Sequence, residues 1–251
     1  MALQDESTPD YAGMCNLCGG AVRYPLPWLA TGEPADLREA LVCPHCQLNA
    51  RKRAALGLLC ERVPTATARV HLTEQASFAY VWLKRHRRNA TGSEFGIEAS
   101  RADILSNWLR QQGVGEPIAC EDVTALGFPD RSLDAIASFD VLEHVPDYRR
   151  ALAEFGRCLR SGGWLVLTAP FRNGDEATLV RARVRGDGTT EHLLPPEMHV
   201  DPLSGGVLCY YHFGWDLLDV LRELGFARAA WRRDWSPAHA LFAMWTLVAQ
   251  R

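Results

Sequence analysis

Residues 121–170, EDVTALGFPDRSLDAIASFDVLEHVPDYRRALAEFGRCLRSGGWLVLTAP, contain the pattern that decides the fold. The apolar run 133–139 predicts a buried strand, and the apolar side chains of 148–159 recur at helical spacing. A glycine pair then turns the chain into a second apolar strand, 164–168. Strand, helix and strand in this order are typical of a βαβ unit in a mostly parallel sheet.

The same alternation extends to both sides of this stretch and predicts an α/β, Rossmann-like domain. Upstream we expect a strand at 69–72, a helix at 78–86, a weak strand at 90–95 and a helix that Gly113 ends. Downstream we expect a helix at 215–224 and a closing antiparallel pair of strands, 227–231 and 241–250. Residues 172–212 are too long for a simple connection, which predicts an insertion or lid at the functional site.

The bulk composition is that of an ordinary globular protein. The chain has 251 residues, 47% hydrophobic and 23% charged, with a net charge of −3. This length fits one domain plus a small appendage. The chain lacks an apolar run of membrane-spanning length and its first ten residues are polar and acidic, so we expect neither a membrane span nor a signal peptide. Cysteines scattered among apolar neighbours favour a reduced, cytoplasmic setting, and the oligomeric state cannot be read from the sequence.

Two CxxC motifs near the N-terminus predict a structural zinc site. Cys15 and Cys18 form the first pair and Cys43 and Cys46 the second, which together supply the four thiolates that a tetrahedral Zn²⁺ requires. Two disulfides or a chance clustering are the alternative interpretation. Four cysteine ligands leave no open coordination position, so this zinc would not be catalytic.

These motifs divide the chain into three parts. We expect a disordered tail at 1–14, a zinc ribbon with an exit helix at 15–62, and the α/β domain with its insertion at 63–251. Because thiolate coordination couples the metal to local folding, we expect chelation to melt the ribbon and leave the second domain largely intact.

The central stretch closely resembles the core of class I S-adenosylmethionine-dependent methyltransferases of the type 11 kind. The segment with FPD-x-S-LD, then VLEHV, then an amphipathic helix and SGG before a strand, follows that family's pattern, and the resemblance extends over residues 68–170. Residues 43–59, CPHCQLNARKRAALGLL, are similar to a stretch of bacterial zinc-containing methyltransferases with the same second domain. The resemblance implies a methyltransferase with S-adenosylmethionine as its cofactor.

In an open parallel sheet the ligand lies beyond the carboxyl ends of the strands. Glu94, with Phe95 next to it, follows the second predicted strand and is placed to accept hydrogen bonds from ribose hydroxyls. Family resemblance implies that the acid of Glu121-Asp122-Val123 meets the adenine amino group and that the next backbone N–H meets a ring nitrogen. Four residues after the next strand would line the methionine end and the path of the methyl group: Phe139, Asp140, Glu143 and His144. The alternative for all these acids is a role as caps or solvated charges.

The first loop departs from the class I pattern. The family usually has glycines here, which let the backbone approach the cofactor closely, whereas residues 71–76, HLTEQA, contain none. Zinc-bearing relatives also lack the glycine pattern, and Thr73-Glu74 partly matches their loop. Glu74 could still bind the methionine ammonium group. A degenerate, non-catalytic methyltransferase fold therefore stays open.

The insertion concentrates histidines and tyrosines: His192, His199, Tyr210, Tyr211 and His212. Methyl transfer to oxygen or nitrogen often needs a base, and imidazole suits that role at neutral pH. We take His199, in a loop rich in turn residues, as the first candidate base and His144 as the second. An exposed surface histidine is the alternative.

Three functions remain open. The first is a methyltransferase for a small polar acceptor such as a sugar, a glycan precursor or a specialised metabolite. The second is RNA modification guided by the ribbon, since a bacterial ribosomal RNA guanine methyltransferase has a similar domain order; however, residues 1–62 hold six Lys/Arg against seven Asp/Glu, which makes nucleic acid an unfavoured partner. The third is non-catalytic protein binding. We expect the basic runs 51–53, 84–88 and 181–185 to be solvated faces.

Overall fold

A computed structural model describes residues 9–26, 36–199 and 206–251. Its centre is a six-stranded sheet in the order β13-β14-β6-β5-β3-β4. Strands β3 to β6 run parallel to one another, while β14 is antiparallel to β6 and β13 to β14. The mostly parallel sheet and its closing antiparallel pair are therefore confirmed. The bounds of the sheet strands are β3 Val70–Leu72, β4 Thr91–Gly92, β5 Leu133–Phe139, β6 Leu159–Thr168, β13 Arg228–Ser236 and β14 Leu241–Gln250.

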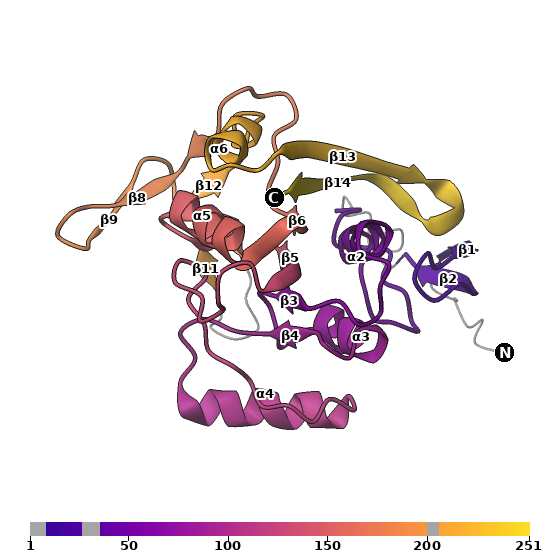
Figure 1. The fold of residues 1–251 in the computed structure, drawn as a ribbon. Coiled ribbons are helices and arrows are strands. Elements are labelled where there is room, and N and C mark those ends of the chain that lie inside the picture. The colour runs from indigo at the N-terminus through magenta and orange to yellow at the C-terminus, as the bar shows by residue number, and fades with distance from the viewer. Residues whose placement is uncertain (1–8, 27–35, 200–205) are drawn as a thin grey trace, which may run out of the picture.

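Helices cover both faces of this sheet (Figure 1). Because side chains alternate along a strand, Ala137 of β5 and Val166 of β6 enter the core beneath α2 and α3, whereas Ile136 and Leu165 enter the core beneath α5 and α6. Helix α4 lies at one end of the molecule (Figure 1), and its Leu109 is buried in the core that α2 and α3 share. The bounds of the helices are α2 Ala50–Arg62, α3 Phe78–His86, α4 Ala99–Gln111, α5 Tyr148–Cys158 and α6 Leu217–Glu223, with short turns η1 Leu142–His144 and η2 Pro237–His239. Among the described residues, none of the helices has the length and apolar character needed to cross a membrane.

The segment before Glu121 joins the sheet through a single bridge. Only Cys120 pairs with Glu94, although the pairing keeps the parallel direction. The Glu94 N–H donates to the carbonyl of Ala119 at 2.9 Å, and the Glu121 N–H donates to the carbonyl of Glu94 at 3.0 Å. These two hydrogen bonds hold the acidic residues after Cys120 at the edge of the sheet where the parallel strands have their carboxyl ends.

The N-terminal ribbon is joined to the second domain. Its hairpin consists of β1 Asp10–Met14 and β2 Ala21–Pro25, so the disordered tail predicted at 1–14 is wrong for residues 10–14; residues 1–8 lie outside the described ranges. Leucines of α2 pack in one core with β3, and the boundary predicted between 62 and 63 does not separate two cores.

Arg53 of α2 ties the ribbon to the far end of the chain. Its side chain is fully buried, and its guanidinium donates to Asn16 Oδ1 at 3.1 Å and to the carbonyls of His239 and Ala240 at 2.7 and 3.1 Å. The expectation of a solvated face for the run 51–53 is therefore wrong: Arg51 is also buried, with 6% of its surface exposed.

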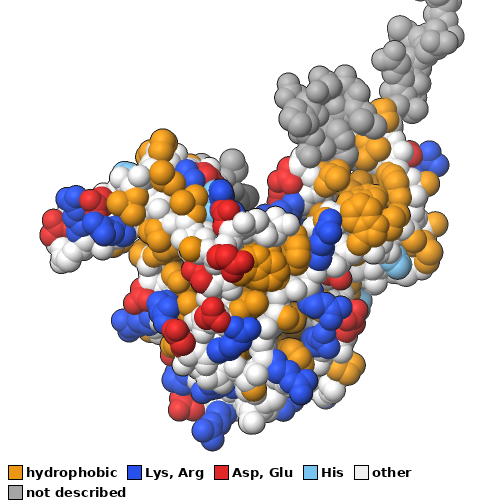
Figure 2. Space-filling model, turned by 90° about the horizontal axis from the view of Figure 1, so that it is seen from above, with side chains coloured by type: hydrophobic (Ala, Val, Ile, Leu, Met, Phe, Trp, Pro, Cys, Tyr) orange, Lys and Arg blue, Asp and Glu red, His pale blue; other side chains and the backbone are white. Residues whose placement is uncertain are grey.

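The insertion forms three small two-stranded sheets. The hairpin β8–β9 projects from the body (Figure 1) and ends in charged side chains (Figure 2), where Arg183 and Arg185 both pair with Glu191. The other two sheets lie against the body of the domain. The bounds are β7 Leu179–Val180, β8 Ala182–Val184, β9 Thr190–His192, β10 Met198–His199, β11 Val207–Leu208 and β12 Tyr211–His212.

His71 in β3 should make the fold sensitive to acid. Its ring is buried between the hydroxyls of Thr91 and Ser93, 3.0 and 3.1 Å from its two nitrogens, and burial lowers its pKa to about 4. The unfolded chain takes up this proton near pH 6.5 and the folded chain only near pH 4, so stability is lost as the pH falls through that window. We expect His71 to account for about 3 kcal/mol of that loss.

Urea unfolding of the wild type and of His71→Gln at pH 7, 5.5 and 4.5 measures this contribution. The variant should lose less stability than the wild type over the window, because glutamine does not titrate. Parallel losses in the two proteins would contradict the assignment.

Candidate active site

A cavity of about 1040 Å³ opens at the carboxyl ends of β3 and β5. Its walls come from the first loop, the segment after Cys120, the end of β5 with η1, the insertion and the ribbon. Nine of the ten residues predicted to bind the cofactor line this one cavity: Thr73, Glu74, Glu94, Phe95, Glu121, Asp122, Val123, Phe139 and Asp140. Both candidate bases, His144 and His199, line it as well. The tenth residue, Glu143, does not line it and is fully buried.

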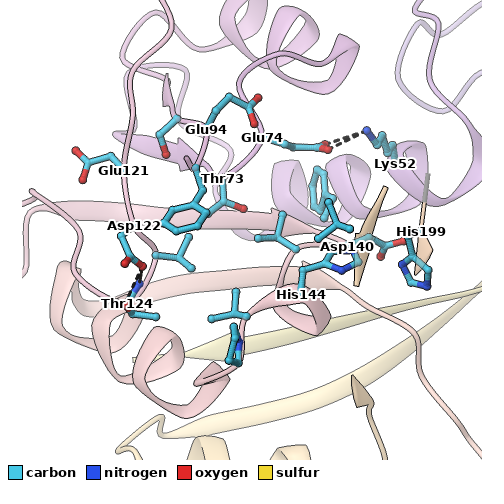
Figure 3. Close-up of a pocket in the computed structure, with 18 of the residues that line it drawn as sticks. Lys52, Thr73, Glu74, Glu94, Glu121, Asp122, Thr124, Asp140, His144 and His199 are labelled. Atoms are coloured by element: carbon cyan, nitrogen blue, oxygen red, sulfur yellow. Dashed lines mark hydrogen bonds and ion pairs between the residues drawn. The ribbon is translucent and has the colours of Figure 1, made fainter. Parts of the chain in front are cut away.

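Acidic groups stand at one end of the cavity (Figure 3). Asp122 is held in place because its Oδ1 accepts hydrogen bonds from the backbone N–H and the hydroxyl of Thr124, at 2.8 and 2.7 Å. Glu121 instead accepts from the Gly127 N–H at 2.9 Å, which turns its carboxylate toward its own loop. Of the two acids, Asp122 is therefore the one better placed to meet a ligand.

Glu94 and the first loop form the adjoining wall. The Glu94 carboxylate accepts a hydrogen bond from the Ala76 N–H, and the Thr73 N–H donates to the Ala137 carbonyl at 3.1 Å. None of the residues 71–76, all of which the structure describes, has a positive φ. The loop therefore needs no glycine for its conformation, which explains how HLTEQA can stand where the family usually has glycines.

Glu74 faces Lys52 of α2 across the cavity wall, with 3.0 Å between Oε1 and Nζ (Figure 3). The two side chains are each about one-fifth exposed. A carboxylate beside an ammonium group matches the ammonium and carboxylate that an amino acid presents. This pair fits the methionine end of S-adenosylmethionine, and its lysine comes from the ribbon.

Asp140, at the end of β5, is clamped by two arginines of the ribbon region. Arg38 contacts its carboxylate through both Nη atoms at 2.6 and 2.7 Å, and Arg51 Nε lies 3.3 Å away. The Thr168 hydroxyl also donates to it, at 2.8 Å. Burial alone would raise the pKa of Asp140, but the charges of Arg51 and Arg38 outweigh burial and hold it well below its usual range. Neither Arg38 nor Arg51 was among the residues predicted for this site.

Glu143 lies beneath the cavity floor with both carboxylate oxygens lacking a hydrogen-bond partner in the described part of the chain. Burial, and secondly the negative charge of Asp140, raise its pKa well above the usual range. Two histidine nitrogens face it: His144 Nε2 lies 3.8 Å and His199 Nδ1 3.7 Å from Glu143 Oε1.

The two histidines are oriented by their other nitrogens. His144 Nδ1 lies 2.9 Å from the Leu208 carbonyl, and His199 Nε2 lies 3.1 Å from Glu197 Oε1. The rings meet edge to face, with 4.9 Å between centroids. None of the other aromatic and histidine residues of the insertion lines the cavity. His192 is exposed on β9, Tyr210 and Tyr211 pack in the core beneath α5 and α6, and His212 contacts Glu197.

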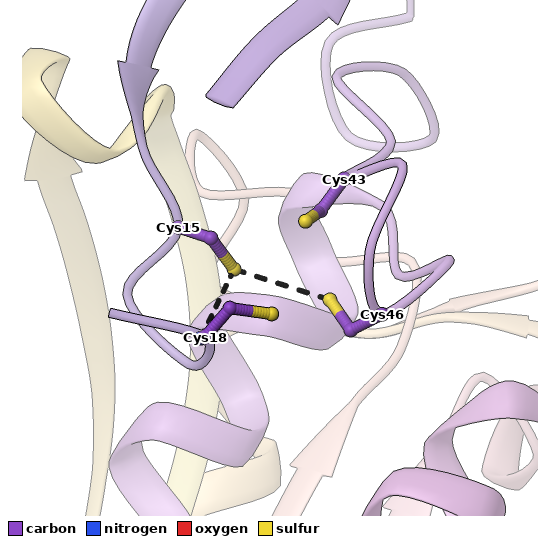
Figure 4. A group of neighbouring side chains, drawn as sticks. All are labelled: Cys15, Cys18, Cys43 and Cys46. Carbon is purple, nitrogen blue, oxygen red and sulfur yellow. Dashed lines mark hydrogen bonds between the residues drawn. The ribbon is translucent and has the colours of Figure 1, made fainter. Parts of the chain in front are cut away.

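The four N-terminal cysteines converge (Figure 4). Their Sγ atoms all lie within 4.8 Å of one another, and Cys15 Sγ is 3.9 Å from Cys46 Sγ. A tetrahedral Zn²⁺ with Zn–S bonds of about 2.3 Å requires sulfurs about 3.8 Å apart. All eight cysteines, each within the described ranges, are free thiols. The group therefore fits a zinc ion better than disulfides.

Both CxxC turns have the same backbone geometry. The Cys15 N–H donates to the Gly20 carbonyl at 3.0 Å, and the Cys43 N–H donates to the Leu48 carbonyl at the same distance. In each turn, the residue four positions after the first cysteine has a left-handed conformation, with φ of 71° at Gly19 and 59° at Gln47. Repeated turns of this kind present two thiols from each turn to one point.

The sheet topology and the place of the cavity define the class of protein. A mostly parallel sheet with a closing antiparallel pair, and a cavity beyond the carboxyl ends of its strands, make this a Rossmann-like domain of the class I methyltransferase type. Residues 77–167 match the family model described as "Methyltransferase domain". Over these residues the chain is thus similar to the domain of S-adenosylmethionine-dependent methyltransferases.

Individual relatives are distant. The ubiquinone biosynthesis O-methyltransferase of Coxiella burnetii is 29% identical over 91 residues, which are 36% of this chain and 38% of that protein. The chain thus spans well under half the length of the curated relatives it matches. A solved S-adenosylmethionine-dependent methyltransferase from Mesorhizobium loti has a TM-score of 0.53 at 18% identity, covering 82% of this chain and all of that one. The [4+2]-cyclase SpnF has a TM-score of 0.52 at 19% identity, covering 76% of this chain and 63% of that one. These likenesses show the fold.

Proposed function

We propose that the protein transfers the methyl group of S-adenosylmethionine to a small polar acceptor. The observation that carries the proposal is the convergence of separate segments on one cavity, with Asp122 and the His144–His199 pair at opposite ends of it (Figure 3). Asp122 and the backbone N–H of Val123 would hold the adenine, and Glu94 the ribose. Glu74 and Lys52 would hold the methionine ammonium and carboxylate groups.

The cofactor supplies an electrophilic methyl group on a sulfonium sulfur. A lone pair of the acceptor forms the new bond to the methyl carbon while the carbon–sulfur bond breaks and its electron pair returns to sulfur. The products are the methylated acceptor and S-adenosylhomocysteine, and an acceptor O–H or N–H releases one proton. His199 is our first candidate for taking that proton and His144 the second, because both line the cavity and each has a fixed ring orientation.

The ribbon gives no support to RNA as the acceptor. Arg51 and Arg53 are buried, so the basic run 51–53 is not presented to a phosphate backbone. The zinc proposed at the four cysteines would then have a structural role. Free thiols are typical of reducing compartments, which supports a proposed cytoplasmic location.

Calorimetry with two ligands tests the assignment of the cavity. Methylthioadenosine keeps the adenosine of S-adenosylhomocysteine but has neither the ammonium nor the carboxylate group. Because Glu74 would contact only the amino-acid part, Glu74→Gln should weaken binding of S-adenosylhomocysteine about 10- to 100-fold and leave methylthioadenosine unchanged. Asp122→Ala should weaken both ligands by a similar factor, since both carry adenine.

The test depends on how each variant changes the affinity for one ligand relative to the other, more than on the size of any single change. A Glu74→Gln protein that loses affinity for both ligands to the same degree would place the amino-acid end elsewhere. Wild-type protein that binds neither ligand would contradict the proposed function and favour a non-catalytic role for the fold.

A further inference from the structure

At the acceptor end of the cavity lies a group of three side chains that could hold a metal ion. Glu143, His144 and His199 each direct one ligand atom toward a common point, and these atoms all lie within 4.8 Å of one another. Glu143 and His144 are adjacent on η1, whereas His199 comes from β10 of the insertion. Two imidazoles and one carboxylate are a common ligand set for divalent transition metals.

The buried carboxylate is the observation that points to a ligand. Glu143 has no exposed surface, and neither of its oxygens has a hydrogen-bond partner in the described part of the chain. A polar group buried without such a partner is unfavourable, and a charged one more so. A cation at this point would satisfy the carboxylate.

The histidines are oriented as metal ligands are. His144 Nδ1 lies against the Leu208 carbonyl and His199 Nε2 against Glu197, so each outer nitrogen is placed to donate its hydrogen to an oxygen. The inner nitrogens, His144 Nε2 and His199 Nδ1, then carry their lone pairs toward the same Glu143 oxygen. Metal-binding histidines almost always have an outer partner of this kind, because it fixes the tautomer and the ring orientation.

The distances suit an ion between the three atoms. The two inner nitrogens lie 3.8 and 3.7 Å from Glu143 Oε1. Bonds of about 2.1 Å to nitrogen and oxygen require ligand atoms about 3–3.4 Å apart, so a shift of a few tenths of an ångström would bring each nitrogen to the required separation from Glu143 Oε1. A neighbouring group, Glu197 with His199 and Cys209, is a poorer candidate because Glu197 already pairs with Arg181 and His212.

We propose that Glu143, His144 and His199 bind a divalent transition-metal ion at the acceptor end of the cavity. Three protein ligands leave coordination positions open, and since His144 and His199 both line the cavity, those positions face it. An oxygen of the acceptor is the group that would fill one, and its hydroxyl would become more acidic there. The acceptor part of this proposal rests on the proposed function; metal binding itself does not.

The metal role and the base role exclude each other at His199, since both use the Nδ1 lone pair. In the metal-loaded protein, activation of the acceptor falls to the ion instead of the imidazole. The binding stoichiometry therefore distinguishes the two roles without an acceptor in hand.

Zinc binding per chain tests the proposal directly. Full-length protein is saturated with Zn²⁺, freed of excess metal and analysed for zinc content, and calorimetric titration with Zn²⁺ gives the affinities. We expect two zinc ions per wild-type chain, one at the cysteines and one here. Glu143→Gln and His199→Ala should each retain one, with binding at the second site weakened at least about 100-fold. His192→Ala, which removes an exposed histidine outside the cavity, should retain two.

Binding of S-adenosylhomocysteine serves as the check on folding and as the separate test of the proposed function. Variants that lose one zinc and still bind S-adenosylhomocysteine like the wild type support the metal site. One zinc per wild-type chain, or two in both Glu143→Gln and His199→Ala, overturns it. Wild-type protein that binds two zinc ions but no S-adenosylhomocysteine would refute the methyltransferase and leave the metal site standing.

Discussion

Replacing Cys46 with serine is expected to abolish cofactor binding together with zinc binding. The helix α2 begins four residues after this cysteine and carries Arg51 and Lys52 to the cavity wall. Leu56 and Leu59 of the same helix pack in the main core. Structural zinc contributes on the order of 10 kcal/mol to the folding of small zinc domains, which is as large as the whole stability of a typical domain.

Two measurements check this result. Thermal unfolding of Cys46→Ser should occur far below that of the wild type, and calorimetry should detect no binding of S-adenosylhomocysteine. Cys120→Ser is the matched control, because Cys120 is an exposed free thiol outside the cysteine cluster. A Cys46→Ser protein with wild-type cofactor affinity would contradict this expectation. It would support the prediction from the sequence that the second domain is independent of the metal.

The second large effect is expected at Arg51. Its guanidinium is buried beside Asp140, whose side chain is 18% exposed, so Arg51→Met leaves a largely buried carboxylate with a single remaining arginine, Arg38. Breaking a buried ion pair on one side costs about 3–5 kcal/mol. Urea unfolding at pH 7 should show a loss of that size.

A double variant separates the charge from the packing. Asp140→Asn together with Arg51→Met removes both charges, and most of the lost stability should return. If the double variant is as unstable as the two single losses added together, the two side chains are not coupled, and the clamp on Asp140 has no energetic role.

Much of the α/β domain could be predicted because its signals are local. The helix at Phe78–His86 and the strand at Leu133–Phe139 have the bounds that their apolar spacing predicts. The residues at the strand ends could be found for a related reason: parallel strands end at one edge, so Glu94, Asp122 and Asp140 had to be near one another. For these three residues, the position in the sequence and the direction of the strands were sufficient to predict that they lie close together.

The contacts that sequence analysis missed join residues that are far apart in the chain. Arg38 and Asp140 are 102 positions apart, and no local pattern distinguishes an arginine that pairs inward from one on a solvated face. The burial of Glu143 depends on the docking of the insertion, which brings His199 and Leu208 over η1. The missing glycines had a physical explanation only when the φ values of the loop were known.

The path of α2 has a consequence for how such a chain can change over evolutionary time. One helix of 13 residues, about 20 Å long, joins the cysteine cluster at its start to the wall of the cavity and the main core along its length. The ribbon is therefore not a detachable module that can be lost, swapped or appended without altering the cavity. Recombination at the junction near residue 63 would remove part of the binding site along with the ribbon, so the two halves should be inherited as one unit.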